Sequence, residues 1–284
     1  MNEKVKIPDI LVNEVTFPDQ NFRKYVLSLL KKKSINKVKH IDVSNYKIKN
    51  LEGIEYFTSL VSLNCNSNLL TTLNLSSNEE LITLYCNENR LTTLNISKNT
   101  SLVTLYCTSN RLKELNIQNN IVLKDLRCDD NKLKQLDTSK NALLEFIGCD
   151  NNQLKKIDTN KNVALQVLSC CNNQLTIFDF RLNSNLYGLA CKHNCFLSLD
   201  LPVYRYKLFE VDHQERLLTL HKSEKSIDLS KLEPFMKEDC IHDLQGANIK
   251  KMILSDFIEG RDITYNYDCG LENLMDVTIK LKVK

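Results

Sequence analysis

Residues 102–122 read L-V-T-L-Y-C-T-S-N-R-L-K-E-L-N-I-Q-N-N-I-V, and this 21-residue pattern decides the fold because it recurs in register. Each unit has apolar residues at positions 1, 4, 11 and 14, a cysteine at position 6 and an asparagine at position 9. A fixed period of this length predicts a solenoid, because one coil alone cannot bury its apolar face. The seven units follow one another without an insertion and begin at Leu60, Leu81, Leu102, Leu123, Leu144, Leu165 and Leu186.

The start of each unit predicts a short β-strand. Side chains alternate between the two faces of a strand, so positions 4 and 6 point into the coil and positions 3, 5 and 7 point outward. Stacked coils then form one continuous parallel sheet. A degenerate unit precedes the seven, with apolar residues at Val38, Ile41, Val43, Ile48 and Leu51. The last unit frays at Pro202 and Tyr204.

Two ladders of asparagines follow from the period. We expect their side chains to bond backbone groups of the neighbouring coil, because an unpaired buried amide costs about 1–3 kcal/mol. We therefore interpret both ladders as structural rather than ligand-binding. The first, at position 9, contains Asn68, Asn89, Asn110, Asn131, Asn152, Asn173 and Asn194. The second, at position 19, contains Asn78, Asn99, Asn120, Asn141, Asn162 and Asn183.

The cysteines at position 6 form a third inward row. Equivalent Cβ atoms of stacked coils should lie about 4.8 Å apart, which exceeds the roughly 3.8 Å typical of a disulfide. No C-x-x-C pair accompanies them. We predict buried thiols that act as small apolar fillers. These residues are Cys65, Cys86, Cys107, Cys128, Cys149, Cys170 and Cys191.

The pattern resembles the leucine-rich repeat family in its nested 21-residue (IRREKO-like) form, and it is similar to the cysteine-ladder repeats of internalin-type bacterial surface proteins. The resemblance implies a solenoid with its parallel β-sheet on the concave side. It also implies recognition of a ligand on that concave face. The repeat itself implies only a binding scaffold and does not identify the ligand.

The chain before the repeats predicts a capping helix. Residues 17–25 read F-P-D-Q-N-F-R-K-Y and resemble internalin N-terminal caps. Phe22, Tyr25, Val26, Leu29 and Leu30 fall on one apolar helix face. Basic residues over 31–39 replace the Asp-rich calcium loop of many such caps, so we predict no calcium there.

The chain after residue 206 loses the 21-residue register and alternates instead. Runs such as Ile263-Tyr265-Tyr267 and Val277-Ile279-Leu281 predict five or six antiparallel strands. They resemble the immunoglobulin-like module that follows internalin-type repeats. The predicted domains are a helical cap over 1–37, the solenoid over 38–206 and a β-sandwich over 207–284.

The composition and the absence of certain motifs argue against several classes of function. The 284 residues carry 38 Lys+Arg and 35 Asp+Glu, a balance that argues against a dedicated nucleic-acid binder. No apolar run reaches the roughly 20 residues of a membrane span. Nucleotide-binding loops and the common hydrolase and metalloprotease motifs are missing from the sequence. We therefore expect a monomer that is not an enzyme and needs no metal or other cofactor.

The outward strand positions are free to vary, so recognition should lie there. Tyr85, Tyr106, Arg127 and Phe146 fall in four adjacent coils, and Tyr and Arg are enriched among binding hot spots. The alternative is that the tyrosines only stack and stabilise the sheet. Acidic residues flank the aromatic row, and we add three of them to the candidate ligand-binding residues: Asp125, Asp129 and Asp150.

Four cysteines lie outside the position-6 row. Cys171 and Cys195 should be exposed with His193 between them, and soft ligands of this kind can hold zinc. The spacing matches no established metal motif, so we predict no metal site. Cys240 and Cys269 fall together in the C-terminal module, and their sequence positions leave a disulfide open.

The resemblance to internalin-type proteins implies a recognition or adhesion protein that binds a protein or glycan on its concave face, at a bacterial cell surface or after secretion. The sequence given shows no signal-peptide apolar region, and its many thiols fit a reducing compartment. The alternatives are therefore a cytoplasmic scaffold, an effector that binds an intracellular protein, or a structural spacer.

Overall fold

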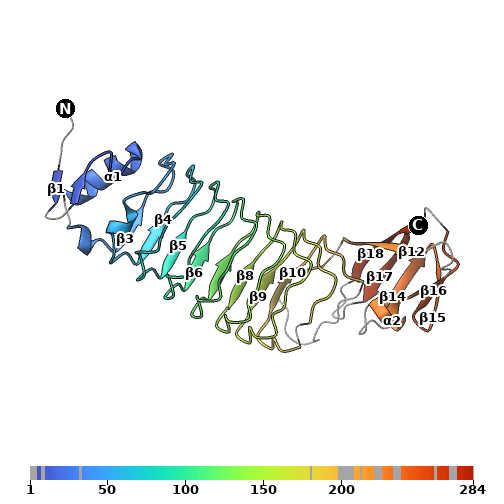
Figure 1. The fold of residues 1–284 in the computed structure, drawn as a ribbon. Helices are drawn as coiled ribbons and strands as arrows, with labels where there is room; N and C mark the ends of the chain where they lie inside the picture. The colour runs from blue at the N-terminus through green and yellow to red at the C-terminus, as the bar shows by residue number, and fades with distance from the viewer. Residues whose placement is uncertain are drawn as a thin grey trace.

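The computed structural model describes residues 5–7, 10–31, 34–179, 181–197, 208–211, 213–220, 226–232, 238–258, 261–268 and 274–283. It is an elongated stack of coils with a helical segment at one end and β-sheets at the other (Figure 1). Several residues named above lie outside the described ranges: Lys32, Lys33, Pro202, Tyr204 and Cys269.

Nine short strands form one sheet along the stack, and every pairing in it is parallel. From β4 to β10, each strand occupies positions 3–5 of its repeat unit, and the middle residue is buried as the alternation predicts. The strands are β3 (His40–Asp42), β4 (Ser62–Asn64), β5 (Thr83–Tyr85), β6 (Thr104–Tyr106), β7 (Asp125–Arg127), β8 (Phe146–Gly148), β9 (Val167–Ser169), β10 (Gly188–Ala190) and β11 (Leu208–Glu210).

The first asparagine ladder bonds as predicted. The side-chain nitrogen of Asn110 donates to the carbonyl of Cys86 in the preceding coil at 3.0 Å and to that of Cys107 in its own coil at 3.1 Å. Its oxygen accepts from the backbone N–H of Leu91 at 3.0 Å. The same set of three bonds recurs at Asn68, Asn89, Asn131, Asn152, Asn173 and Asn194.

The second ladder also bonds the preceding coil, and it shows a pairing rule of its own. The side-chain nitrogen of Asn183 donates to the carbonyls of Thr159 and Asn162, both at 2.9 Å. Its oxygen accepts the Thr159 hydroxyl at 2.7 Å, as that of Asn162 accepts the Thr138 hydroxyl. Each of these threonines stands 24 residues before the asparagine that it bonds. Where Leu or Ile stands 24 residues before the asparagine, the amide oxygen accepts no bond from the described residues. This is the case at Asn78, Asn99, Asn120 and Asn141.

Replacing Thr159 by valine should therefore destabilise the protein beyond the loss of one ordinary hydroxyl. Thr159→Val keeps the side-chain size but leaves the Asn183 oxygen unpaired, at an expected cost of about 1–3 kcal/mol. Urea unfolding measures the change. Thr72→Val, which alters an exposed threonine, is the control, and equal effects of the two substitutions would contradict the assignment.

The cysteine row fills the interior, as predicted. All seven ladder cysteines are buried. The thiols of Cys65, Cys86, Cys128 and Cys149 each donate to a carbonyl of the next coil at 3.3–3.4 Å. Burial raises the pKa of the Cys65 thiol to about 12, and it raises the pKa of Cys107 well above its ordinary value.

The ladder thiols should be unreactive in the native protein. The thiolate is the attacking form of cysteine, and both burial and the raised pKa oppose it. At pH 8 an aromatic disulfide reagent should modify the ladder cysteines only after urea unfolding, while the less buried Cys171 and Cys195 react in the folded state. Mass spectrometry of the labelled peptides separates the two groups. Equal labelling of both groups in native protein would rule out the packed interior.

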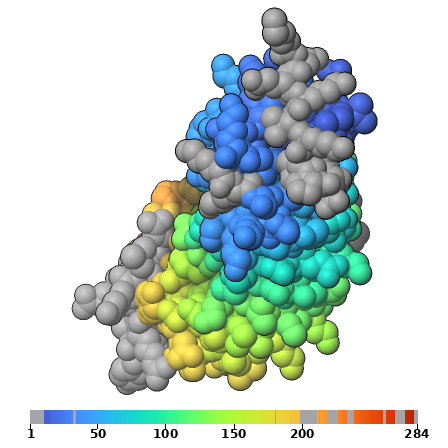
Figure 2. Space-filling model, turned by 90° about the vertical axis from the view of Figure 1, so that its left-hand side faces the viewer, coloured from blue at the N-terminus to red at the C-terminus, as the bar shows by residue number. Residues whose placement is uncertain are grey.

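The N-terminal cap contains the predicted helix α1 (Gln20–Leu30), with Phe22 and Val26 buried. The Asp19 carboxylate caps it by accepting the N–H groups of Asn21 and Phe22, and its second oxygen accepts the N–H of Lys49 from the degenerate unit that precedes the seven repeats. Figure 2 views this end and shows the blue N-terminal residues lying against the cyan and green coils. The other elements here are β1 (Val5–Ile7), antiparallel to β2 (Ile10–Val12), and the 3₁₀ turns η1 (Ile35–Lys37) and η2 (Ile54–Tyr56).

The repeat sheet continues past residue 206. Strand β11 pairs with β10 at a spacing of 20 residues, with Gly188 opposite Leu208. Buried Val211 follows it as the cysteines follow the other strands. The side-chain amide of Gln214 donates to the carbonyls of Cys191 and Val211, as the ladder asparagines do. We therefore propose that an eighth coil closes the solenoid and that the C-terminal module begins after this coil.

The C-terminal module contains two small sheets in the described residues, ordered β12-β18-β17-β14 and β13-β16-β15. Buried Ile263, Tyr265 and Tyr267 confirm the predicted alternation. The expected set of five or six antiparallel strands is wrong: seven strands are described, and β12 and β18 are parallel. The elements are β12 (Gln214–Leu220), β13 (Ser226–Asp228), α2 (Leu229–Leu232), η3 (Glu238–Cys240), β14 (Ile241–Gln245), β15 (Asn248–Lys250), β16 (Ile253–Ser255), β17 (Ile263–Asp268) and β18 (Leu274–Val283).

The parallel pair is compatible with the order of the strands in the sequence. Strands β12 and β18 stand at opposite ends of the module's sequence, so no short hairpin forces them to run antiparallel. The module also contacts the solenoid directly, because the Tyr265 hydroxyl donates to the Leu197 carbonyl at 2.8 Å. Among the described residues, no helix is long and apolar enough to cross a membrane.

Candidate functional site

The outward side chains at repeat positions 3 and 5 of β4–β10 form what we call the sheet face. Its centre is the one place where large side chains stand in a row. Tyr85, Tyr106 and Arg127 occupy position 5 of three successive strands, and Phe146 occupies position 3 of the next. All four are partly exposed. The structure thus brings together the four residues that the sequence predicted.

These four side chains contact one another. The rings of Tyr85 and Tyr106 lie 5.0 Å apart between centroids at an angle of 56°. The guanidinium carbon of Arg127 lies 4.8 Å from the centre of the Tyr106 ring and 4.6 Å from that of Phe146. Cation–π contacts of this kind contribute about 0.5–1 kcal/mol at exposed sites. The row therefore stabilises itself as well as presenting apolar surface.

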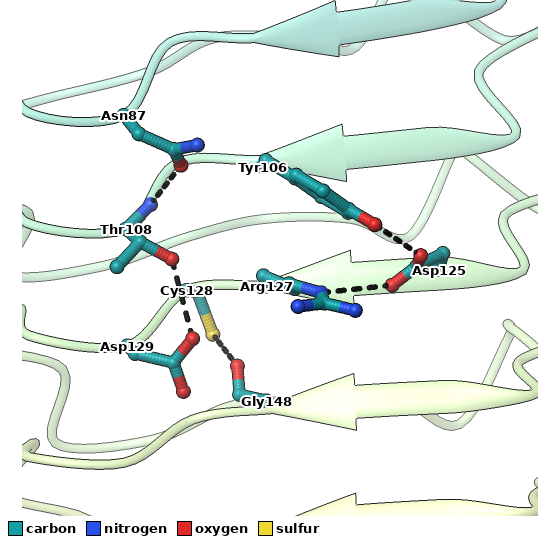
Figure 3. A network of polar contacts seen from close by, with 8 residues as sticks. All are labelled: Asn87, Tyr106, Thr108, Asp125, Arg127, Cys128, Asp129 and Gly148. Carbon is teal, nitrogen blue, oxygen red and sulfur yellow. Dashed lines mark hydrogen bonds and ion pairs between the residues drawn. The ribbon is translucent and has the colours of Figure 1, made fainter. Parts of the chain in front are cut away.

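Asp125 joins the row from position 3 of the Arg127 strand (Figure 3). The Tyr106 hydroxyl donates to one carboxylate oxygen at 2.5 Å, and Nε of Arg127 lies 3.6 Å from the other. Partial burial, followed by the hydrogen bond to Asp125, raises the pKa of the Tyr106 phenol to about 12. The phenol therefore stays protonated and donates at all physiological pH values.

Asp129 and Asp150 hold the coils together from position 7. An Asp129 oxygen accepts the backbone N–H of Asp150 at 2.9 Å, and an Asp150 oxygen accepts that of Cys171 at 2.6 Å. The amide oxygens of Asn66 and Asn87 make the same bond to the following coil. Position 7 is thus a third ladder, which sequence reasoning treated as freely variable. The recurring Asn, Asn, Asp and Asp were the signal for it.

Gly148 leaves the space that this ladder needs. A Cβ atom at this position would lie 3.0 Å from both carboxylate oxygens of Asp129, so a larger residue would displace the carboxylate. The second Asp129 oxygen accepts the Thr108 hydroxyl at 3.2 Å (Figure 3). The acidic side chains beside the aromatic row are therefore held in place by the sheet.

Cys171, His193 and Cys195 do not converge on one point that could hold a metal ion. The ring of His193 packs against His213 of the eighth coil, with 5.1 Å between centroids. A cavity of about 510 Å³ opens beside them and includes Cys195 among its lining residues. Within the described ranges, no group of three or more His, Cys, Asp or Glu side chains is arranged to hold a metal ion.

Asp150 predicts a pH-dependent stability. Burial raises the pKa of its carboxyl, the Ser169 and Cys171 hydrogen bonds oppose this, and the Asp129 and Asp130 charges add to it. Ionisation therefore costs the folded state more than the unfolded state, and this penalty grows as pH rises from the ordinary value of 3.8 through the raised pKa. Asp150→Asn should melt at a higher temperature than the native protein at pH 7.

The gain should shrink as pH falls below the ordinary value, because the native carboxyl is then neutral in both states. Thermal melts across this range measure it. Asp137→Asn is the control, because hydrogen bonds to Ser139 lower the pKa of that exposed carboxyl and the substitution should bring no gain. A lower melting temperature of Asp150→Asn at pH 7 would contradict the assignment.

Comparison with known proteins places the fold. No protein-family model matches the sequence. No curated protein matches it either. Internalin C2 from Listeria monocytogenes str. 4b F2365 is similar over 69% of this chain and 96% of its own, with 19% identity and a TM-score of 0.64. YopM, a leucine-rich effector protein from Yersinia pestis, is similar over 68% of this chain and 62% of its own, with 23% identity and a TM-score of 0.55.

The functional domain of InlJ from Listeria monocytogenes, which includes a cysteine ladder, aligns over 95% of this chain and 98% of its own, with 19% identity. Its TM-score of 0.39 is too low for the superposition to support the fold, so the cysteine ladder of this protein stands on its own contacts. The chain has the internalin type of leucine-rich repeat fold, a parallel solenoid with a helical cap before it and β-sheets after it.

Proposed function

We propose that this protein is a non-enzymatic recognition protein that binds a protein or glycan ligand through the sheet face, at a bacterial cell surface. The observation that carries the proposal is the row of Tyr85, Tyr106, Arg127 and Phe146. Large side chains of these types dominate the binding energy of interfaces. Here they stand partly exposed at the centre of a face whose other outward residues, apart from Val167, are small or polar.

The contacts within the row do not argue against a ligand. Rings and guanidinium that already pack together lose little conformational freedom on binding, and such preorganisation favours affinity. Asp125 sits within the row and touches both Tyr106 and Arg127. Asp129 and Asp150 belong to the margin of the proposed site, where their carboxylates add negative charge while bonding the next coil.

The proposed cell-surface location is supported by the fold alone, through its similarity to internalin C2. The similarity to YopM, an effector protein, supports the alternative of an effector that binds an intracellular protein. Both readings use the same recognition surface. The third reading, a spacer that only presents the C-terminal module, predicts that the sheet face binds nothing.

A matched pair of fourfold variants tests the proposal. The first replaces Tyr85, Tyr106, Arg127 and Phe146 by alanine. The control replaces exposed residues of the same four coils at repeat position 10, away from the strands, by alanine: Arg90, Arg111, Lys132 and Gln153. Circular dichroism and thermal melts first establish that both variants fold.

The native protein and the two variants are then compared in pull-downs from host-cell and bacterial lysates and on a glycan array. We expect a partner that the native protein and the control retain and that the sheet-face variant loses, by at least about tenfold in affinity given two or more lost hot spots. A partner retained equally by all three would move recognition away from the sheet face.

A further inference from the structure

Arg127 is the one cation on the sheet face: no other residue at positions 3 and 5 of β4–β10 is Lys, Arg or His. Its side chain is 43% exposed. It stands at the centre of the row, and acidic or neutral residues occupy the positions around it. A lone cation in acidic surroundings either only balances the neighbouring negative charges or binds an anionic ligand. The contacts of the Arg127 guanidinium distinguish these two roles.

The guanidinium of Arg127 contacts two aromatic rings and faces one carboxylate. The rings of Tyr106 and Phe146 lie 4.8 Å and 4.6 Å from its central carbon, on neighbouring coils to either side. Nε points toward Asp125 at 3.6 Å, which is longer than a hydrogen bond. The contacts of Arg127 with the described residues include no hydrogen bond from its two terminal nitrogens (Figure 3).

The outer edge is therefore the part of Arg127 that is left for a ligand. Two parallel N–H groups in one plane match the two oxygens of a carboxylate, and such forked pairs are the strong form of charge-assisted hydrogen bond. The contacts with the Tyr106 and Phe146 rings restrict the Arg127 side chain before a ligand arrives, so less side-chain freedom is lost on binding. If charge balance were the only role of Arg127, a closer pairing with Asp125 would be expected.

The surroundings favour a carboxylate with a single charge. Asp125, Asp129 and Asp150 lie on the same and the following coil, and their repulsion rises with the charge of the incoming anion. A phosphate dianion is disfavoured for this reason. On the coils that follow, position 5 is occupied by Gly148, Ser169 and Ala190. The Asp129 carboxylate fills the space over Gly148, and the small side chains of Ser169 and Ala190 leave room for a polypeptide on the coils beyond it.

We propose that Arg127 is the specificity-determining residue of the sheet face and that it binds the side-chain carboxylate of an aspartate or glutamate on a protein partner. This proposal rests on the proposed function, because it names the chemistry that the same face recognises. The clamp of Tyr106 and Phe146 positions the fork, and Asp125 holds its inner edge.

The proposal is tested on the full chain with small probes. Nitrogen-15 spectra resolve the Nε–Hε groups of the arginines, and that of Arg127 is followed while blocked glutamate (N-acetyl, N-methylamide) is added. The matched probes are blocked glutamine, glucuronate and inorganic phosphate. We expect a saturable shift of Arg127 with blocked glutamate and at least about tenfold weaker binding of the glutamine probe, because only the carboxylate accepts both N–H bonds.

Two lysine variants complete the experiment. Arg127→Lys keeps the charge but removes the planar fork, so binding of blocked glutamate should weaken about tenfold. Arg111→Lys, which alters an exposed arginine away from the strands, should leave it unchanged. A glutamate affinity that survives Arg127→Lys, or a glutamine affinity equal to that of glutamate, would overturn the proposal. If only glucuronate or only phosphate saturates the Arg127 shift, the ligand group is a sugar acid or a phosphate, and its assignment to a protein side chain is wrong.

The outcome separates this inference from the proposed function. If a captured partner is lost with the fourfold sheet-face variant but kept by Arg127→Lys, and no probe distinguishes glutamate from glutamine, recognition stays on the sheet face and the carboxylate fork is wrong. If the fourfold variant also keeps every partner, both proposals fail.

Discussion

Hydrogen bonds from side-chain amides to the backbone of the neighbouring coil are the constraint on which the structure depends. A solenoid coil has turns at both ends of its strand, and the buried peptide groups of these turns have no strand partner. Asn110 bonds two such carbonyls and one N–H, and Asn120 bonds two carbonyls at the other turn. A buried polar group left unpaired costs about 1–3 kcal/mol, so the 21-residue period holds wherever both asparagines are kept.

The same constraint explains what the sequence could predict. Cys107, Asn110 and Asn120 stand at fixed spacing, and their burial and bonding follow from that spacing. The eighth coil escaped prediction because Val211 and Gln214 replace cysteine and asparagine at a spacing of 20 residues. The pairing of β12 with β18 also escaped, because alternation shows which face a residue occupies and not the strand beside it.

The fixed 21-residue period also made part of the candidate site predictable. Tyr85, Tyr106, Arg127 and Phe146 could be placed in adjacent coils by counting, and the structure joins them. The role of Asp129 was not readable in this way, because an outward side chain can turn along the stack and accept a backbone N–H of the next coil. Outward position therefore does not by itself mean a side chain available to a ligand.

The position-9 asparagine makes the same three bonds at every junction between inner coils, and this regularity bears on how such a protein can change over time. One whole coil can be gained or lost by unequal duplication without leaving a peptide group unmatched, whereas a change of one residue displaces an asparagine. Each gained coil separates the helical cap from the C-terminal sheets by about another 4.8 Å. The length of the stack therefore changes in steps of 21 residues, and the outward residues of the sheet can change independently of that length.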